Sequence, residues 1–147
     1  MKAFSMLELI FVLMILGILA AIALPKLDFS TQQSKILALK AEFALIQSAL
    51  SAHRNDIFLN KNTNLKALDN AQIGAEAQDL FYCAKICASA NCCAKSLLES
   101  PIYSSLKGWM KTGANTYSFN LGKERLEFQF RPDTQSFECT QNCKYLR

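Results

Sequence analysis

Six cysteines are the residues of this 147-residue chain best suited to metal or redox chemistry. They form two CxxxC pairs separated by two adjacent cysteines: Cys83, Cys87, Cys92, Cys93, Cys139 and Cys143. Four thiolates could hold a tetrahedral zinc ion, which is one interpretation of the pattern. In an oxidising compartment the same even count indicates disulfide bonds, and we favour that interpretation. The choice depends on whether the chain is exported.

The pairing of these cysteines follows in part from their spacing. If Cys83 and Cys87 lie on one helical turn, their Cβ atoms are too far apart to bridge each other. We therefore expect a link from the segment 83–93 to the segment 139–143. It would close a loop of about 50 residues and stabilise the fold by about 4 kcal/mol. The other pairings of six cysteines remain open.

Other chemistry finds little support in the sequence. His53 is the only histidine, and its place on a helical seam favours a packing role over that of a base or ligand. Phosphate-binding glycine loops and CxxC redox motifs are absent from the sequence. The formal net charge of +4 is spread along the chain, which does not favour direct nucleic-acid binding. We predict a protein that is not an enzyme and needs no metal or cofactor.

The N-terminus carries a long apolar run, LIFVLMILGILAAIAL at residues 9–24, preceded by a single carboxylate at Glu8. Counted from Phe4 as a helix, the run spans about 31 Å, the hydrocarbon thickness of a bilayer. Three interpretations are open: a secretory signal cut after Ala23, a plain signal anchor, or a short leader cut between Ala3 and Phe4. Only the third gives Glu8 a role.

The third interpretation resembles the type IV pilin and type II secretion pseudopilin family. Five residues in register carry the resemblance: Ala3, Phe4, Glu8, Gly17 and Pro25. Ala3 ends the leader, where the family usually has glycine, and Phe4 becomes the first mature residue, which the family N-methylates. Glu8 is then the fifth mature residue, the signature glutamate of the family. Gly17 and Pro25 match its helix-weakening and helix-kinking positions.

The resemblance implies a structural subunit that a prepilin peptidase processes and that assembles into a helical filament for secretion, DNA uptake or adhesion. Its implied partners are identical or related pilin subunits and an inner-membrane assembly platform. The implied location is the bacterial inner membrane, crossed once with the N-terminus cytoplasmic and the head periplasmic, and then the pilus or pseudopilus. Glu8 would pair with the N-terminal ammonium of a neighbouring subunit, which offsets the burial of both charges.

An alternative from another class fits the same cysteines. The chain could be a secreted or membrane-anchored disulfide-rich binding domain, in which an ordinary signal sequence precedes the head and Glu8 is incidental. The mature N-terminus separates these possibilities, because it is methylated Phe4 in the first, Leu24 in a secreted domain and Met1 in a simple anchor.

Hydrophobic periodicity predicts the elements that position these residues. Apolar residues recur at helical spacing beyond the N-terminal run, and we call them the inner seam: Ile36, Leu39, Phe43, Ile46, Leu50 and His53. We expect one helix from Phe4 to about Arg54. A loop follows over 55–74, and then a short helix over 75–90.

Strand-like runs follow at Trp109–Met110 or Thr116–Leu121, Arg125–Arg131 and Ser136–Thr140. They predict an antiparallel meander that covers the inner seam, with a hairpin turn at 122–124 and a second turn at 132–135. The expected class is α+β, a long N-terminal helix packed on a small antiparallel sheet, as in pilins. The expected segments are a leader (1–3), an apolar helix (4–27) and a globular head (28–147), the head comprising a helix (30–54), a loop with a short helix (55–100) and a sheet (109–140).

Overall fold

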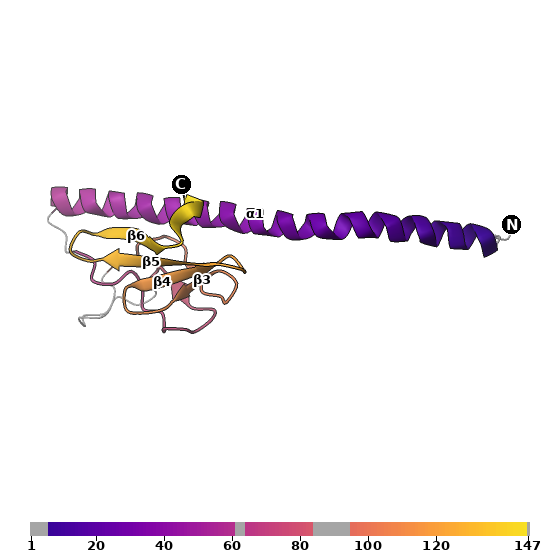
Figure 1. The fold of residues 1–147 in the computed structure, drawn as a ribbon. Coiled ribbons are helices and arrows are strands. Elements are labelled where there is room, and N and C mark those ends of the chain that lie inside the picture. Colours follow the sequence, from indigo (N-terminus) through magenta and orange to yellow (C-terminus); the bar gives the residue numbers. More distant parts are fainter. Residues whose placement is uncertain (1–5, 61–63, 84–94, 147) are drawn as a thin grey trace. The chain divides into compact units, whose positions relative to one another are not determined.

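The computed structural model describes residues 6–60, 64–83 and 95–146, without the side chains of residues 22–30 and 60. The fold is α+β, as predicted. Helix α1 spans Met6–Asn60, and a short 3-10 helix, η1, spans Cys143–Leu146. The chain divides into two compact units, Met1–Ser34 and Lys35–Arg147. The second unit contains both sheets and the hydrophobic core (Figure 1).

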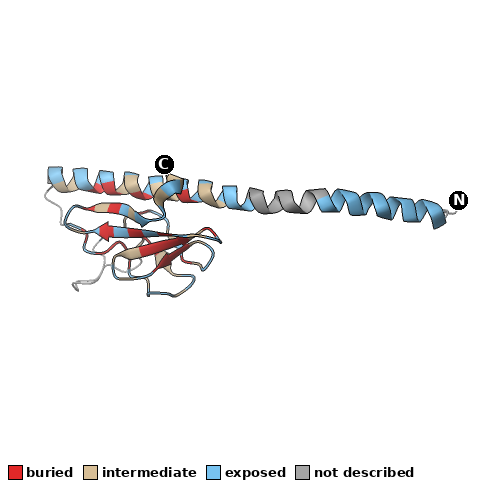
Figure 2. Cartoon of the chain, viewed as in Figure 1, coloured by how far each residue is buried: buried red, intermediate tan, exposed pale blue. Residues whose placement is uncertain are grey.

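The inner seam of α1 forms one side of that core. Leu39, Ile46 and Leu50 are buried, and Ile36 and Phe43 are half-buried against them. His53 is also buried, which agrees with its predicted packing role. Buried residues recur along one side of α1 in this unit, as the period of 3.6 residues requires (Figure 2).

The other side of the core is a four-stranded antiparallel sheet in the order β3-β4-β5-β6. Its strands are β3 (Trp109–Lys111), β4 (Thr116–Asn120), β5 (Arg125–Arg131) and β6 (Ser136–Gln141). The predicted antiparallel meander is confirmed, but it has four strands, because both segments predicted as alternatives for the first strand are strands. In the β4–β5 turn, Leu121 N–H donates to the carbonyl of Glu124 at 2.9 Å. Gly122 has φ +98° there, a conformation in which an L side chain would be strained.

Alternation along β5 determines which side chains enter the core. Leu126, Phe128 and Phe130 are buried, whereas the residues between them are exposed. Phe128 stacks on Phe137 of β6 with ring centroids 5.5 Å apart, and Trp109 of β3 lies 4.7 Å from Phe128. The aromatic residues are therefore sheet core, as their period of two predicts.

Groups from outside this sheet donate hydrogen bonds to both of its edge strands. Along β3, Gly74 N–H donates to the Lys111 carbonyl at 2.9 Å and Ser105 N–H donates to the Trp109 carbonyl at 2.8 Å. Along β6, the side-chain amide of Gln47 on α1 donates to the carbonyl of Phe137. These bonds satisfy edge groups that could otherwise pair with another strand.

Two expectations for the segment after the inner seam are wrong. Helix α1 ends at Asn60 and not near Arg54, because Ile57 continues the half-buried side for one more turn. The helix predicted over 75–90 is absent from its described part, residues 75–83. A ribbon of β1 (Asp79–Leu80) paired with β2 (Ile102–Tyr103) replaces it.

The reason for the ribbon is tertiary hydrogen bonding. Ala77 N–H donates to the Ser104 carbonyl at 2.8 Å, and Ser104 N–H donates to the Gln78 carbonyl at 2.9 Å. Periodicity within 75–90 gives no information about Ser104, which lies far along the chain. The rest of the predicted helix, residues 84–90, lies outside the described residues.

The structure contradicts the predicted localisation, in which the chain crosses the inner membrane once. In the described part of the chain, no helix combines the length and the apolar character that a membrane crossing requires.

Candidate functional site

The N-terminal part of α1 presents a continuous exposed apolar surface, which we call the apolar stretch (residues 6–21). Every residue in it is exposed, and in Figure 2 it is coloured pale blue throughout. Twelve large apolar side chains between Met6 and Leu19 are more than 40% exposed: Met6, Leu7, Leu9, Ile10, Phe11, Val12, Leu13, Met14, Ile15, Leu16, Ile18 and Leu19. Since an isolated soluble protein rarely leaves so large an apolar area in water, this surface is the first candidate site.

The apolar stretch surrounds α1 on all sides. The large side chains follow one another almost without interruption, so no polar face remains for solvent. An amphipathic helix buries one stripe, whereas a helix that is apolar all round requires burial all round. This arrangement distinguishes the stretch from the inner seam, which a single sheet can cover.

Within the described chain, Glu8 is the only carboxylate of the apolar stretch, and it is exposed in the first turn of α1. Its place near the helix N-terminus is favourable for a negative charge. Gly17 lies in the middle of the stretch, and a Cβ added there would meet no atom within 4 Å, so its side is open to a neighbouring helix.

The other predicted processing and assembly residues are less fully described. Ala3 and Phe4 lie outside the described residues. α1 continues through Pro25, whose side chain is not described. Their predicted roles in processing and assembly stay predictions.

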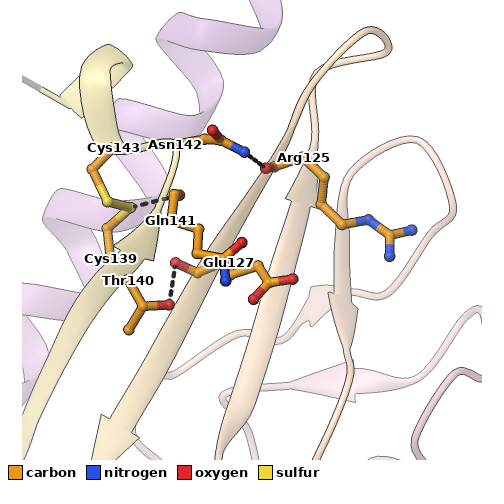
Figure 3. The surroundings of a disulfide bond; sticks show 7 residues. All are labelled: Arg125, Glu127, Cys139, Thr140, Gln141, Asn142 and Cys143. Atoms are coloured by element: carbon orange, nitrogen blue, oxygen red, sulfur yellow. Dashed lines mark hydrogen bonds between the residues drawn. A yellow bond between two sulfur atoms is a disulfide. The ribbon is translucent and has the colours of Figure 1, made fainter.

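A disulfide joins Cys139 and Cys143, whose Cα atoms lie 5.8 Å apart (Figure 3). It connects β6 to η1. The predicted link from the segment 83–93 to the segment 139–143 is therefore wrong for both of these cysteines. The two sulfur atoms are bonded to each other, so they cannot serve as zinc ligands in this state.

A local turn makes the short bridge possible. β6 shifts register against β5 near Glu127, so that Thr140 has no direct partner in the pairing, and Thr140 Oγ1 donates to the Glu127 carbonyl at 3.2 Å. Asn142 has φ +58°, and its side-chain amide donates to the Arg125 carbonyl at 2.7 Å (Figure 3). Asparagine tolerates this left-handed conformation better than most residues, and the turn brings Cys143 back toward Cys139.

Cys83 is also disulfide-bonded, and the described cysteines include no free thiol. Its backbone N–H donates to Ser96 Oγ at 2.8 Å. The remaining disulfide candidates, Cys87, Cys92 and Cys93, lie outside the described residues. The described cysteines are therefore in disulfides, as the interpretation favoured from the sequence predicted.

A buried polar cluster around Asp69 was missed by sequence reasoning. Lys111 Nζ donates to Asp69 Oδ1 at 2.7 Å, and Tyr117 OH donates to Asp69 Oδ2 at 2.9 Å. Backbone N–H groups of Ala71 and Phe81 donate to the same carboxylate at 3.1 and 3.0 Å. Burial, and then the nearby Asp69 charge, raise the pKa of Tyr117 well above its ordinary value, so this phenol stays neutral.

The cluster ties the segment after α1 to the sheet. One sequence signal could have indicated it. Lys111 lies two positions after Trp109 on a strand, and therefore on the same buried face. A lysine at such a position requires a buried acidic partner.

A second polar contact crosses from α1 to the sheet. Trp109 Nε1–H donates to Glu42 Oε2 at 2.7 Å. Partial burial raises the pKa of the Glu42 carboxyl, and the hydrogen bond from Trp109 opposes that shift. Glu42 therefore positions the indole in the core at the expense of some desolvation.

A small hollow of about 190 Å³ lies between α1 and the segment 95–97. Among its lining residues, Lys95 forms an ion pair with Asp56 at 3.4 Å, in which both side chains are about half exposed. Such an exposed pair contributes little to stability. In the described chain, no three acidic, histidine or cysteine side chains gather closely enough to hold a metal ion.

No family model, curated protein or solved structure matches the chain in comparisons with known proteins.

Proposed function

We propose that this protein is a pilin-like structural subunit that assembles with further copies, or with related subunits, into a helical filament through the apolar stretch of α1. The observation that carries the proposal is the all-round exposure of twelve large apolar side chains on a single helix. Burying them would contribute on the order of 20 kcal/mol before the entropic losses of association.

The all-round distribution also bears on the number of neighbours. One partner helix covers only a stripe of about 100° or somewhat more, so a dimer would leave most of the apolar stretch in water. Several neighbouring helices are needed to cover it. A helical array supplies them to every subunit, because each copy has neighbours on all sides.

In this assembly Glu8 would set the axial register between neighbouring subunits. A carboxylate among packed apolar helices is costly unless it finds a positive partner. Cleavage between Ala3 and Phe4 by a prepilin peptidase would create an ammonium near it in sequence, and the same group of a neighbouring subunit would provide the pairing. Only one axial offset between subunits allows every pair to form.

The second unit, Lys35–Arg147, supplies the folded head. Hydrogen bonds from Trp109 to Glu42 and from Gln47 to Phe137 join its sheet to α1, and the Asp69 cluster joins the segment after α1 to the sheet, which would give the filament a compact folded domain. The buried carboxylate of Asp69 and the half-buried carboxylate of Glu42 both make contacts within the core, to Lys111, Tyr117 and Trp109, which supports a structural role for them.

The direct test is assembly of the chain with and without the Glu8 carboxylate in cells that supply a prepilin peptidase, so that the ammonium of Phe4 can form. We expect the parent chain to form particles that sediment far faster than a monomer and appear as filaments in negative-stain images. Glu8→Gln should reduce the assembled fraction sharply, because the ammonium of each neighbour would lose its partner at a loss of roughly 3–5 kcal/mol per contact.

The matched control is Glu127→Gln, which removes an exposed carboxylate from the outer face of β5 and should assemble like the parent. Both variants should keep the melting temperature of the head. The proposal fails if the parent chain remains a monomer, or if Glu8→Gln assembles as well as Glu127→Gln.

A further inference from the structure

Asp69 and Lys111 meet inside the head in an arrangement suited to a covalent bond between their side chains. Lys111 Nζ donates to Asp69 Oδ1 at 2.7 Å and to the backbone carbonyl of Asp69 at 3.3 Å. A carboxyl C–O bond is about 1.2 Å long, so Nζ lies within about 4 Å of Cγ, the carbon that an amine would attack. Two groups held this close react far faster than the same groups free in solution.

Burial distinguishes this ion pair from the others of the described chain. The side chains of Lys111 and Asp69 are 7% and 0% exposed. The pair of Lys144 and Glu124 has the same distance of 2.7 Å, but its side chains are 62% and 34% exposed. Water solvates the charges of an exposed pair, whereas an apolar core penalises them. Replacing two buried charges by one neutral amide removes that penalty, which favours condensation at the buried pair.

The second oxygen of the Asp69 carboxylate is held by two further donors. Tyr117 OH donates to Oδ2 at 2.9 Å, and the backbone N–H of Phe81 donates to it at 3.0 Å. When an amine attacks Cγ, negative charge develops on Oδ2, and two donors aimed at such an oxygen form an oxyanion hole. Burial raises the pKa of Tyr117 well above its ordinary value, so the phenol keeps its proton and stays a donor.

We propose that the side chains of Lys111 and Asp69 condense into an intramolecular isopeptide bond, with release of one water molecule. The ion pair in the structure is the reactant of this step. The bond ties the segment after α1 to β3 across 42 positions of the chain. It constrains the unfolded chain as a disulfide does, but reductants do not break it. The inference does not depend on the proposed filament, because its residues all belong to the head.

The step balances within the two side chains. One proton moves from Nζ to Oδ1 along the hydrogen bond between them, which leaves an amine and a carboxylic acid. The lone pair of Nζ then forms a bond to Cγ, and the π electrons of the carbonyl move to Oδ2. A second proton passes from Nζ to Oδ1, the Cγ–Oδ1 bond breaks with its electron pair, and Oδ1 leaves as water. One ammonium and one carboxylate thus become one amide, with no net change in charge.

The mass of the full chain tests the proposal directly. The chain is purified, its disulfides are reduced, and it is denatured before mass spectrometry. We expect it to be lighter by one water molecule than the sequence from its observed N-terminus requires. Trypsin should then release residues 67–85 joined to residues 108–123, because it does not cleave after an acylated lysine. Fragmentation of this species should place the link between Asp69 and Lys111.

Variants test the roles of the two reacting groups in samples taken at intervals after a pulse of synthesis. Lys111→Arg keeps the positive charge, but its guanidinium stays protonated and does not attack, so the loss of water should disappear. Tyr117→Phe removes one donor from Oδ2, and we expect the link to form at least about tenfold more slowly. The matched control, Tyr103→Phe, changes an exposed tyrosine and should link like the parent.

The exposed pair of Lys144 and Glu124 is a control within the same molecule, and its tryptic peptides should stay separate. The proposal is overturned if the parent chain, with a head that melts cooperatively, keeps its full mass, or if the loss of water maps to other residues. Equal rates for Tyr117→Phe and Tyr103→Phe overturn the oxyanion hole. A parent chain of full mass that still forms filaments overturns the isopeptide bond and leaves the proposed function standing.

Discussion

The ammonium of Lys111 lies 2.7 Å from Oδ1 of Asp69, and both side chains are almost fully buried, with exposures of 7% and 0%. The pair joins the segment that follows α1 to the edge strand β3. A buried ion pair of this kind is tolerated when the other hydrogen-bonding sites of its charged groups are also satisfied. Here the Tyr117 hydroxyl and two backbone N–H groups donate to the remaining acceptor sites of the Asp69 carboxylate.

Removing the lysine should therefore destabilise the head strongly. Lys111→Met keeps the approximate volume but leaves Asp69 as a buried charge without its counterion, and we expect a loss of roughly 3–5 kcal/mol in unfolding free energy. Chemical denaturation measures it. Lys107→Met, at an exposed position near the same strand, should change stability by less than about 0.5 kcal/mol. Equal effects of the two variants would contradict a structural role for the pair.

The phenol of Tyr117 gives a smaller and separable effect. Tyr117→Phe removes the hydrogen bond to Asp69 Oδ2 and preserves the ring, which lies 4.8 Å from Phe81. We expect a loss of about 1–3 kcal/mol, because the buried carboxylate keeps its other donors. A double variant with Lys111→Met should show non-additive losses in denaturation, since both residues contact one carboxylate. Strictly additive losses would argue against a coupled cluster.

Glu42 should make the head less stable as the pH rises. Its pKa in the folded state is raised above the ordinary value, so the folded state favours the protonated form. This contribution is fully present below the unfolded pKa, near 4.5, and is lost as the pH rises through the folded pKa. Glu42→Gln keeps an acceptor for the indole of Trp109 without the charge. It should gain stability relative to the parent from pH 4.5 upward.

The measurement is the difference in unfolding free energy between Glu42→Gln and the parent across that pH range. The difference is needed because Glu124 acts in the opposite sense. Its hydrogen bond with Lys144 lowers the pKa of Glu124, so that contribution is lost as the pH falls. A difference that does not change with pH would show that Glu42 does not titrate abnormally.

The bridge between Cys139 and Cys143 should contribute modestly. It closes a loop of only a few residues, for which chain entropy predicts about 2 kcal/mol, about half of the value expected for the longer loop. Replacing both cysteines by serine, with the other cysteines unchanged, should lower the unfolding free energy by that amount. Tryptic mapping without reductant should find the 139–143 pair in the parent, and a link from either residue to the segment 83–93 would contradict the structure.

The mature N-terminus tests the processing hypothesis. Mass spectrometry of the protein from its native source should find a chain that begins at methylated Phe4. Replacing Ala3 by leucine should block cleavage, because the leader would then end in a large residue. A chain that begins at Leu24 would instead support the secreted binding domain, and one that keeps Met1 would support a simple anchor.

Local patterns of the sequence determined the helix and the main sheet. The period of 3.6 residues from Ile36 to His53 identified the buried side of α1, and the period of two in β5 identified its buried face, because each pattern involves side chains close together along the chain. The exposed apolar stretch with Glu8 could likewise be located from the sequence, since it is a continuous run. Its cellular location could not, and the expected membrane crossing was wrong.

Only the tertiary structure decided the contacts between residues far apart in sequence. The ribbon of β1 and β2 depends on hydrogen bonds to Ser104, and the position of Lys111 depends on Asp69, 42 positions away. The pairing of Cys139 with Cys143 joins residues only four positions apart, but it depends on the register shift of β6 against β5 and on the left-handed conformation of Asn142, which spacing alone does not reveal. Such contacts depend on how the whole chain packs, so the residues near them in sequence do not encode them.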